Sequence, residues 1–173
     1  MKFAKTKRWR VYFLLALTIF VFAQGTFVHA DTRSYSEDDA KVLAKTVWGE
    51  ARGCSETQQA AVVWCILNRV DSPLFPNSIQ EVVKQPQQFA GYSGRNPVDP
   101  EILKLVYDVL SRWCIEPNCI AGVGRVLPPS YLYFAGNGTE NRFTERYASG
   151  PLWNWSMESP YEHTENGNNS SLQ

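Results

Sequence analysis

Four stretches of the chain carry apolar residues at the spacing of an α-helix. In the first, Ser36 and Asp39 form a capping-box arrangement ahead of apolar positions, which predicts a helix over about residues 37–50. The second begins at Ser55, which repeats the capping signal with Gln58, and it soon becomes apolar on every face. Because a helix without a polar face belongs in the middle of a domain, we expect this second helix to be central.

The third and fourth helical patterns have starting signals of their own. Asn77 can cap a short helix that runs through Val83. Asp99 and Pro100 begin a longer helix with one apolar stripe, which ends near Cys114. A polar, glycine-bearing loop separates the two.

The segment "SYLYFAGNGTENRF" at residues 130–143 has a different pattern. Aromatic and branched residues lead into Gly136, Asn137 and Gly138, which favours a strand and a turn over a helix. We therefore predict a mostly helical α+β fold with a small β-hairpin or sheet, in one domain over residues 36–160. Residues 161–173 offer little to bury, and we expect them to be disordered.

The first thirty residues have the layout of a secretory signal peptide. Five Lys and Arg side chains precede the mostly apolar run 11–23, and small or polar residues lead to Ala30. The alternative is an uncleaved anchor, although the apolar run falls short of the roughly 20 residues that a spanning helix needs. We expect cleavage near Ala30 and a mature protein that is secreted or held in the cell envelope.

Removal of that segment changes the charge and leaves all four cysteines in place. Twelve basic and seventeen acidic side chains remain, a net charge near −5, which argues against nucleic acid as a partner. Cys114 and Cys119 flank a proline-bearing turn and are the predicted disulfide in an oxidising compartment. Cys54 and Cys65 are separated along one helix by about 16 Å, and Cys65 is alternatively a small core residue.

Several classes of chemistry lack their residues. The mature chain has one histidine, His163, near the polar tail, and neither H-x-x-x-H nor C-x-x-C occurs. Zinc hydrolysis and Ser-His or Cys-His catalysis are therefore disfavoured. No glycine-rich phosphate loop is present. We expect no metal, no cofactor and no nucleotide.

Carboxylate chemistry remains, and Glu50 is the strongest candidate. It follows Leu43 and Val47 at helical spacing, so it shares their apolar face at the last turn of the first helix. Partial burial and the negative end of the helix dipole both favour a protonated carboxyl there, as a general acid requires. The alternative is that Glu50 pairs with Arg52 or another base.

Short motifs follow Glu50 at defined spacings. They are E-A-R-G at 50–53, Gln59, L-N-R-V at 67–70, P-x-F-P at 73–76 and Gln88-Phe89, with a weaker extension from "YLYFAG" to "NW" at 154–155. Together they resemble the SleB-type, spore-cortex-lytic family of cell-wall hydrolases over roughly residues 36–155. The resemblance implies a fold similar to lysozyme and soluble lytic transglycosylases, with Glu50 as the catalytic acid and peptidoglycan as the partner.

One position departs from the family pattern. The family usually has a second acid after E-A-R-G, where this chain has Cys54. We interpret that acid as supportive, because a residue in the tight turn is expected to cap the second helix rather than reach the substrate. Glu56 is the nearest replacement.

Aromatic and amide side chains are the remaining candidates for binding sugars. The predicted set comprises Gln88, Phe89, Tyr92, Tyr133 and Asn137. Aromatic faces suit pyranose rings, although such residues are more often part of a core. Trp153 and Trp155 are expected to close the fold.

The combined prediction is a monomeric lytic transglycosylase that cleaves glycan strands between N-acetylmuramic acid and N-acetylglucosamine, in spore-cortex or wall turnover. Only Glu50 has a motif behind it, and one carboxyl suffices for transglycosylation. A hydrolytic muramidase and a non-catalytic wall-binding module remain as alternatives.

Overall fold

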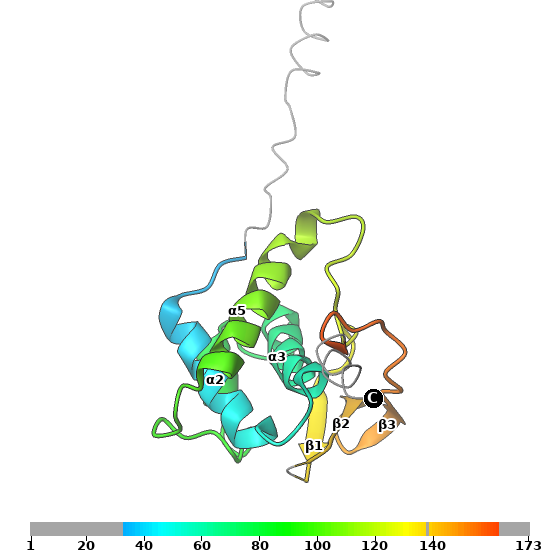
Figure 1. Ribbon diagram of the computed structural model, residues 1–173. Coiled ribbons are helices and arrows are strands. Elements are labelled where there is room, and N and C mark those ends of the chain that lie inside the picture. Colours follow the sequence, from blue (N-terminus) through cyan, green and yellow to red (C-terminus); the bar gives the residue numbers. More distant parts are fainter. Residues whose placement is uncertain (1–32, 138, 163–173) are drawn as a thin grey trace, which may run out of the picture. The chain divides into compact units, whose positions relative to one another are not determined.

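The computed structural model describes residues 33–137 and 139–162, which form four α-helices, one 3₁₀ helix and three strands (Figure 1). In chain order these are α2 Glu37–Ala51, α3 Glu56–Asp71, α4 Ile79–Val83, α5 Pro100–Ile115, η1 Glu116–Asn118, β1 Tyr133–Gly136, β2 Asn141–Arg146 and β3 Ser149–Leu152. The predicted mostly helical α+β fold with a small sheet is confirmed.

Helix α3 is central, as its apolar composition predicts. Its residues from Gln59 to Arg69 are all buried, and it packs against α2, α4, α5 and β1. Cys65 lies in this helix and is fully buried, which raises the pKa of its thiol to about 12. Cys65 is therefore a core residue, as one of the two interpretations of the sequence held.

Two of the predicted helix starts are confirmed. Ser36 and Asp39 form a reciprocal capping box at the start of α2, and the Asp99 carboxylate accepts the backbone N–H groups of Glu101 and Ile102 in α5. These caps satisfy N–H groups that have no partner within the helix.

The predicted caps of α3 and α4 are wrong in detail. Ser55 is the N-cap residue of α3 but makes no capping hydrogen bond with its side chain. The Gln58 side chain does not complete a capping box either, because it accepts the backbone N–H of Asn141 at 2.8 Å. Helix α4 is capped by Ser78 and not by Asn77. A contact with the sheet therefore replaces the Gln58 half of the predicted capping box at α3.

The strands form an antiparallel sheet in the order β1-β2-β3. Asn141 and Phe143 of β2 are almost fully buried, and the sequence analysis did not separate out β3. Asn137 closes the β1–β2 connection: its side-chain oxygen accepts the N–H groups of Thr139 and Glu140 at 3.0 and 2.8 Å. The predicted strand and turn are thus present, with an Asx-type hydrogen-bond pattern in the turn.

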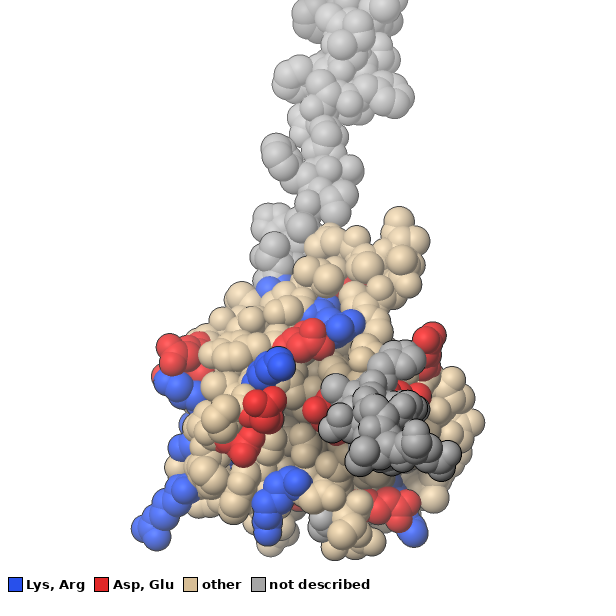
Figure 2. All heavy atoms as spheres, viewed as in Figure 1, with Lys and Arg blue, Asp and Glu red and all other residues tan. Residues whose placement is uncertain are grey.

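No helix among residues 33–137 and 139–162 is long and apolar enough to cross a membrane. The predicted signal peptide at residues 1–30, His163 and most of the predicted tail lie outside the described residues. Basic and acidic side chains are interspersed on the face shown in Figure 2, without a large patch of one sign.

All four cysteines are free thiols here, so the structure does not contain the predicted bond between Cys114 and Cys119. Their pairing on oxidation stays a prediction.

Candidate active site

The carboxyl of Glu50 lies at the last turn of α2 and is held by a loop distant in sequence. Its Oε1 accepts the backbone N–H of Gly91 at 2.7 Å, across 41 positions of the chain. Leu43 and Val47 on the same face are fully buried, whereas Glu50 is partly exposed. The side chain is therefore fixed at one oxygen and still reachable.

Arg52 does not neutralise this carboxyl. Its guanidinium lies 4.5 Å from the centre of the Trp48 ring and donates to the Trp48 carbonyl at 3.3 Å. Within the described part of the chain, Glu50 forms no ion pair. The alternative interpretation of Glu50 as one half of a salt bridge thus has no support in the structure.

Two glycines bring α2 and the loop at residues 85–97 together. A Cβ atom placed on Gly49 would lie 1.9 Å from the Gly91 carbonyl oxygen, and one on Gly91 would lie 2.5 Å from the Gly49 carbonyl. Asn96 reinforces the contact by donating to the carbonyls of Lys45 and Gly91 at 3.0 and 2.8 Å. Sequence analysis missed Gly91 and Asn96; a pair of glycines, each marking a site of close backbone approach, was the available signal.

Arg69 anchors the other end of the same loop. This residue is 2% exposed; its Nη1 donates to the side chain of Gln88 at 3.1 Å, and its Nε donates to the Leu132 carbonyl at 2.6 Å, directly before β1. Its guanidinium lies 5.0 to 5.5 Å from the ring centres of Phe75, Phe89 and Tyr133. The loop is thus held at one end by α3 and β1 and at the other by α2.

The predicted sugar-binding residues have different surroundings. Gln88 is engaged with Arg69, and Phe89 is a core residue, only 7% exposed and packed 5.9 Å from the Phe134 ring. Phe89 therefore has little surface left to stack on a sugar, which corrects that prediction. Tyr92 and Tyr133 are partly exposed, whereas Asn137 is exposed with its side-chain oxygen engaged in the turn.

Four other acids of the described chain form no hydrogen bond with Glu50. Glu81 accepts the Ser78 hydroxyl, Glu140 lies 3.6 Å from Arg142, and Glu56 is exposed. Asp71, the last residue of α3, is not a solvated surface charge. It pairs with Arg33 at 3.0 Å and accepts the Trp113 indole N–H, and its burial raises the pKa of its carboxyl.

Cys54 belongs to the turn between α2 and α3, but Ser55 and not Cys54 is the N-cap residue. The Gln59 side chain donates to the carbonyls of Ala51 and Cys54 at 3.2 and 3.3 Å. The Asn141 amide lies 3.4 Å from the Cys54 sulfur. The position where the family has a second acid is thus packed between α3 and β2.

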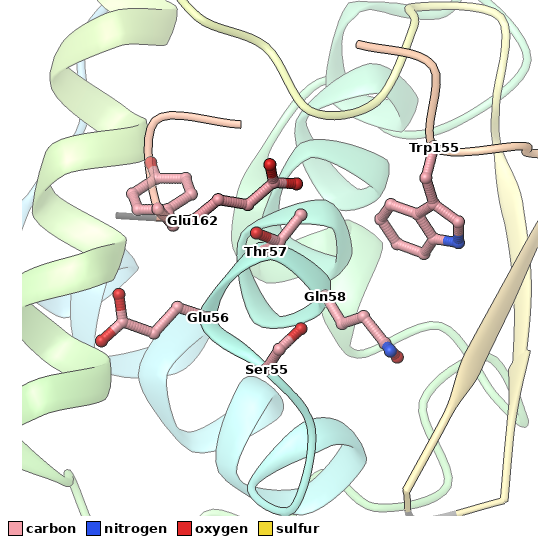
Figure 3. Close-up of a pocket in the computed structure, with 7 residues that line it drawn as sticks. Ser55, Glu56, Thr57, Gln58, Trp155 and Glu162 are labelled. Carbon is pink, nitrogen blue, oxygen red and sulfur yellow. The ribbon is translucent and has the colours of Figure 1, made fainter. Parts of the chain in front are cut away.

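A pocket of about 540 Å³ lies beside the first turn of α3 (Figure 3). Residues 55–58 line one side of it, and Trp155, Tyr161 and Glu162 complete the lining. Glu50 is not among these residues, so the pocket and the candidate acid are separate features. No three His, Cys, Asp or Glu side chains of the described chain are grouped so that they could hold a metal ion.

A family model described as "Cell Wall Hydrolase" matches residues 53–146, more than half of the chain. The chain belongs to the cell wall hydrolase family. The matched span contains α3, the loop, β1 and β2, and it begins three residues after Glu50. The family match therefore covers elements around the candidate acid but does not include Glu50 itself.

Curated relatives carry the name spore cortex-lytic enzyme. The protein of Bacillus subtilis (strain 168) is 38% identical over 82 residues, which is 46% of this chain and 27% of that protein. The protein of Oceanobacillus iheyensis is 34% identical over 91 residues, which is 51% of this chain and 33% of that protein. The chain thus spans about a third or less of the length of these relatives.

A solved structure is also similar to this cell wall hydrolase domain. It is the crystal structure of the catalytic domain of the Bacillus cereus SleB protein, which is 30% identical. The match covers 64% of this chain and 80% of that one, with a TM-score of 0.47.

Proposed function

We propose that this cell wall hydrolase cleaves the glycan strands of peptidoglycan between N-acetylmuramic acid and N-acetylglucosamine, with Glu50 as its acid. The observation that carries the proposal is the placement of Glu50. Its carboxyl is partly exposed, free of ion pairs within the described chain and held at Oε1 by Gly91. A positioned carboxyl that is not neutralised by a base has the capacity for proton transfer.

The proposed reaction is that of a lytic transglycosylase. Protonated Glu50 donates its proton to the glycosidic oxygen, and the bond from that oxygen to C1 of the muramic acid breaks. The resulting carboxylate takes the proton of the 6-hydroxyl of the same sugar, whose oxygen attacks C1 and closes a 1,6-anhydro ring. No water is consumed, and one carboxyl performs both proton transfers.

Hydrolysis would require a second carboxylate at a defined separation, about 5 to 9.5 Å from the first depending on stereochemistry. Glu81, Glu140 and Asp71 have their contacts with other side chains, as described above. These contacts favour transglycosylation, which needs one carboxyl, over hydrolysis, which needs two.

Mass spectrometry of muropeptides tests the proposal. Purified protein is incubated with cortex peptidoglycan and, separately, with vegetative wall, because the relatives' name points to spore cortex. Transglycosylation releases 1,6-anhydromuramic ends one water lighter than reducing ends. Reducing muramic acid that takes up borohydride would instead identify a muramidase, and binding to wall without any released product would identify a wall-binding module.

We also propose that the chain is exported as a monomer, with cleavage near Ala30 and oxidation of Cys114 and Cys119. A disulfide in this short segment closes a small loop, so its stabilisation is at the lower end of the few kcal/mol typical of such bonds. N-terminal sequencing of the exported protein identifies the cleavage site. A peptide map after alkylation shows whether Cys114 and Cys119 are joined. An intact Met1, or two alkylated thiols, would contradict the respective half.

A further inference from the structure

We propose that Asn96 is a positioning residue for Glu50: by fixing Gly91, it sets where the backbone N–H of Gly91 holds the carboxyl. The consequence for lysis rests on the function proposed above. The structural coupling of Asn96, Gly91 and Glu50 does not, and it can be measured without substrate.

The first step of the argument concerns the carboxyl itself. A glutamate side chain has several rotatable bonds and loses conformational entropy when it is fixed. The Gly91 N–H bonds Oε1 at 2.7 Å, and no donor of the described chain bonds Oε2. One oxygen is thus anchored while the other is left to carry the transferable proton, and the anchor sets the direction in which that proton points.

The second step concerns what holds Gly91. The side-chain amide of Asn96 donates to the carbonyls of Lys45 and Gly91 at 3.0 and 2.8 Å, and so ties the second-last turn of α2 to the loop. Two carbonyl acceptors require a group with two N–H donors on a short stem, which the asparagine side chain provides. The Asn96 amide also lies where a Cβ on Gly49 would meet it at 2.9 Å. Asn96 therefore packs beside the contact between Gly49 and Gly91.

A second contact between α2 and this loop supplies a matched control. The Lys45 ammonium donates to the Gly94 carbonyl at 2.6 Å, in an exposed position. It ties the same helix to the same loop but makes no bond to Gly91. If tethering the loop were all that mattered, removing either side chain would have the same effect.

Nuclear magnetic resonance on the ¹⁵N-labelled protein measures the coupling directly. The Gly91 amide proton is expected to follow the titration of the carboxyl it bonds, and Glu50→Gln abolishes this titration. In Asn96→Ala the amplitude falls by at least about half, because hydrogen bonds weaken steeply with misalignment. In Lys45→Met it is unchanged.

Kinetics with soluble glycan strands provide the functional readout. We expect Asn96→Ala to lower kcat at least about 10-fold with less than about a 2-fold change in KM, because a misplaced acid affects the chemical step. Lys45→Met stays within about 2-fold of wild type in both constants. If Asn96→Ala does not fold, Asn96→Ser, which is too short to reach both carbonyls, is measured in its place.

Two outcomes would overturn the inference. One is an unchanged Gly91 titration in the Asn96 variant, and the other is an equal effect of the Asn96 and Lys45 variants on kcat. An inactive wild-type protein would instead refute the proposed function, and the Gly91 titration would still decide the coupling.

Discussion

At the scale of single residues, Glu50 differs from the other acids in what its carboxyl contacts. A backbone N–H holds it and no base of the described chain neutralises it, whereas Asp71, Glu81 and Glu140 each contact a base or a hydroxyl. We expect Glu50→Gln to lower lysis of peptidoglycan by at least about 100-fold, the usual cost of losing a general acid. The amide keeps the shape and an oxygen that can accept the Gly91 N–H, so circular dichroism is expected to be unchanged.

The control for Glu50→Gln makes the same chemical change at Glu56, the nearest other glutamate in the sequence. Glu56 lines the pocket beside α3, away from the contacts of Glu50, and Glu56→Gln is expected to leave lysis within about 2-fold of wild type. A large loss in the Glu56 variant would show that a second carboxyl takes part. A fully active Glu50 variant would remove the basis of the proposed mechanism.

At the scale of elements, the contact between the end of α2 and the loop at residues 85–97 depends on two residues that lack side chains. Gly49→Ala would place a Cβ 1.9 Å from the Gly91 carbonyl, so the loop must move away from α2. Overpacking of this kind costs about 1 to 3 kcal/mol in the free energy of unfolding. Because the same movement displaces the N–H that bonds Glu50, lysis is expected to fall as well.

Gly94 offers the matched control in the same loop, since a Cβ there meets nothing within 4 Å. Gly94→Ala is expected to change the free energy of unfolding by less than about 0.5 kcal/mol. Urea denaturation of the wild type, Gly49→Ala and Gly94→Ala measures the difference in the free energy of unfolding. Equal stability of the two alanine variants would mean that the glycine contact is looser in solution than in the structure.

At the scale of the whole molecule, a group of charged side chains joins the start of the described chain to α3, η1 and the segment between η1 and β1. Arg33 pairs with Asp71 and Glu116 at 3.0 and 2.9 Å, and Arg125 makes a two-pronged contact with Glu116. Burial by itself would raise the pKa of Glu116, but hydrogen bonds and charges from Arg125, and then Arg33, outweigh it and hold that pKa below its usual value of 4.5.

This group predicts how stability depends on pH. A depressed carboxyl pKa contributes stability that is present above 4.5 and is lost as the pH falls through the folded-state pKa of Glu116. Glu116→Gln should therefore lower the free energy of unfolding by about 1 to 3 kcal/mol at pH 7. The deficit should shrink as the pH falls below 4.5 and on through the folded-state pKa of Glu116, where wild type also protonates this group.

Asp71 provides the contrast, because burial raises the pKa of its carboxyl above 3.8. Its contribution is fully present below 3.8 and is lost as the pH rises through the raised value. Asp71→Asn, which is neutral at every pH, is thus expected to destabilise less at pH 7 than Glu116→Gln. Urea denaturation between pH 3 and 7 measures both, and a deficit of Glu116→Gln that does not vary with pH would contradict the assignment.

The helices, two of their four predicted caps, the first two strands and the identity of the candidate acid could be predicted from the sequence alone. Each depends on residues close together in the chain: Ser36 with Asp39, Asp99 with the first turn of α5, and Glu50 within its motif. Apolar periodicity and capping act over three or four positions, so they can be recognised in the sequence before the fold is known.

Only the tertiary structure decided what surrounds Glu50. Gly91 and Asn96 reach α2 across 41 and 51 positions, and Arg69 reaches Leu132 across 63. Phe89, expected to face a sugar, is instead buried in the core against Phe134 and Arg69. The Gln58 side chain, expected to take part in a capping box with Ser55, likewise makes a long-range contact with Asn141. Such partners are chosen by the packing of whole elements, which a local pattern does not encode.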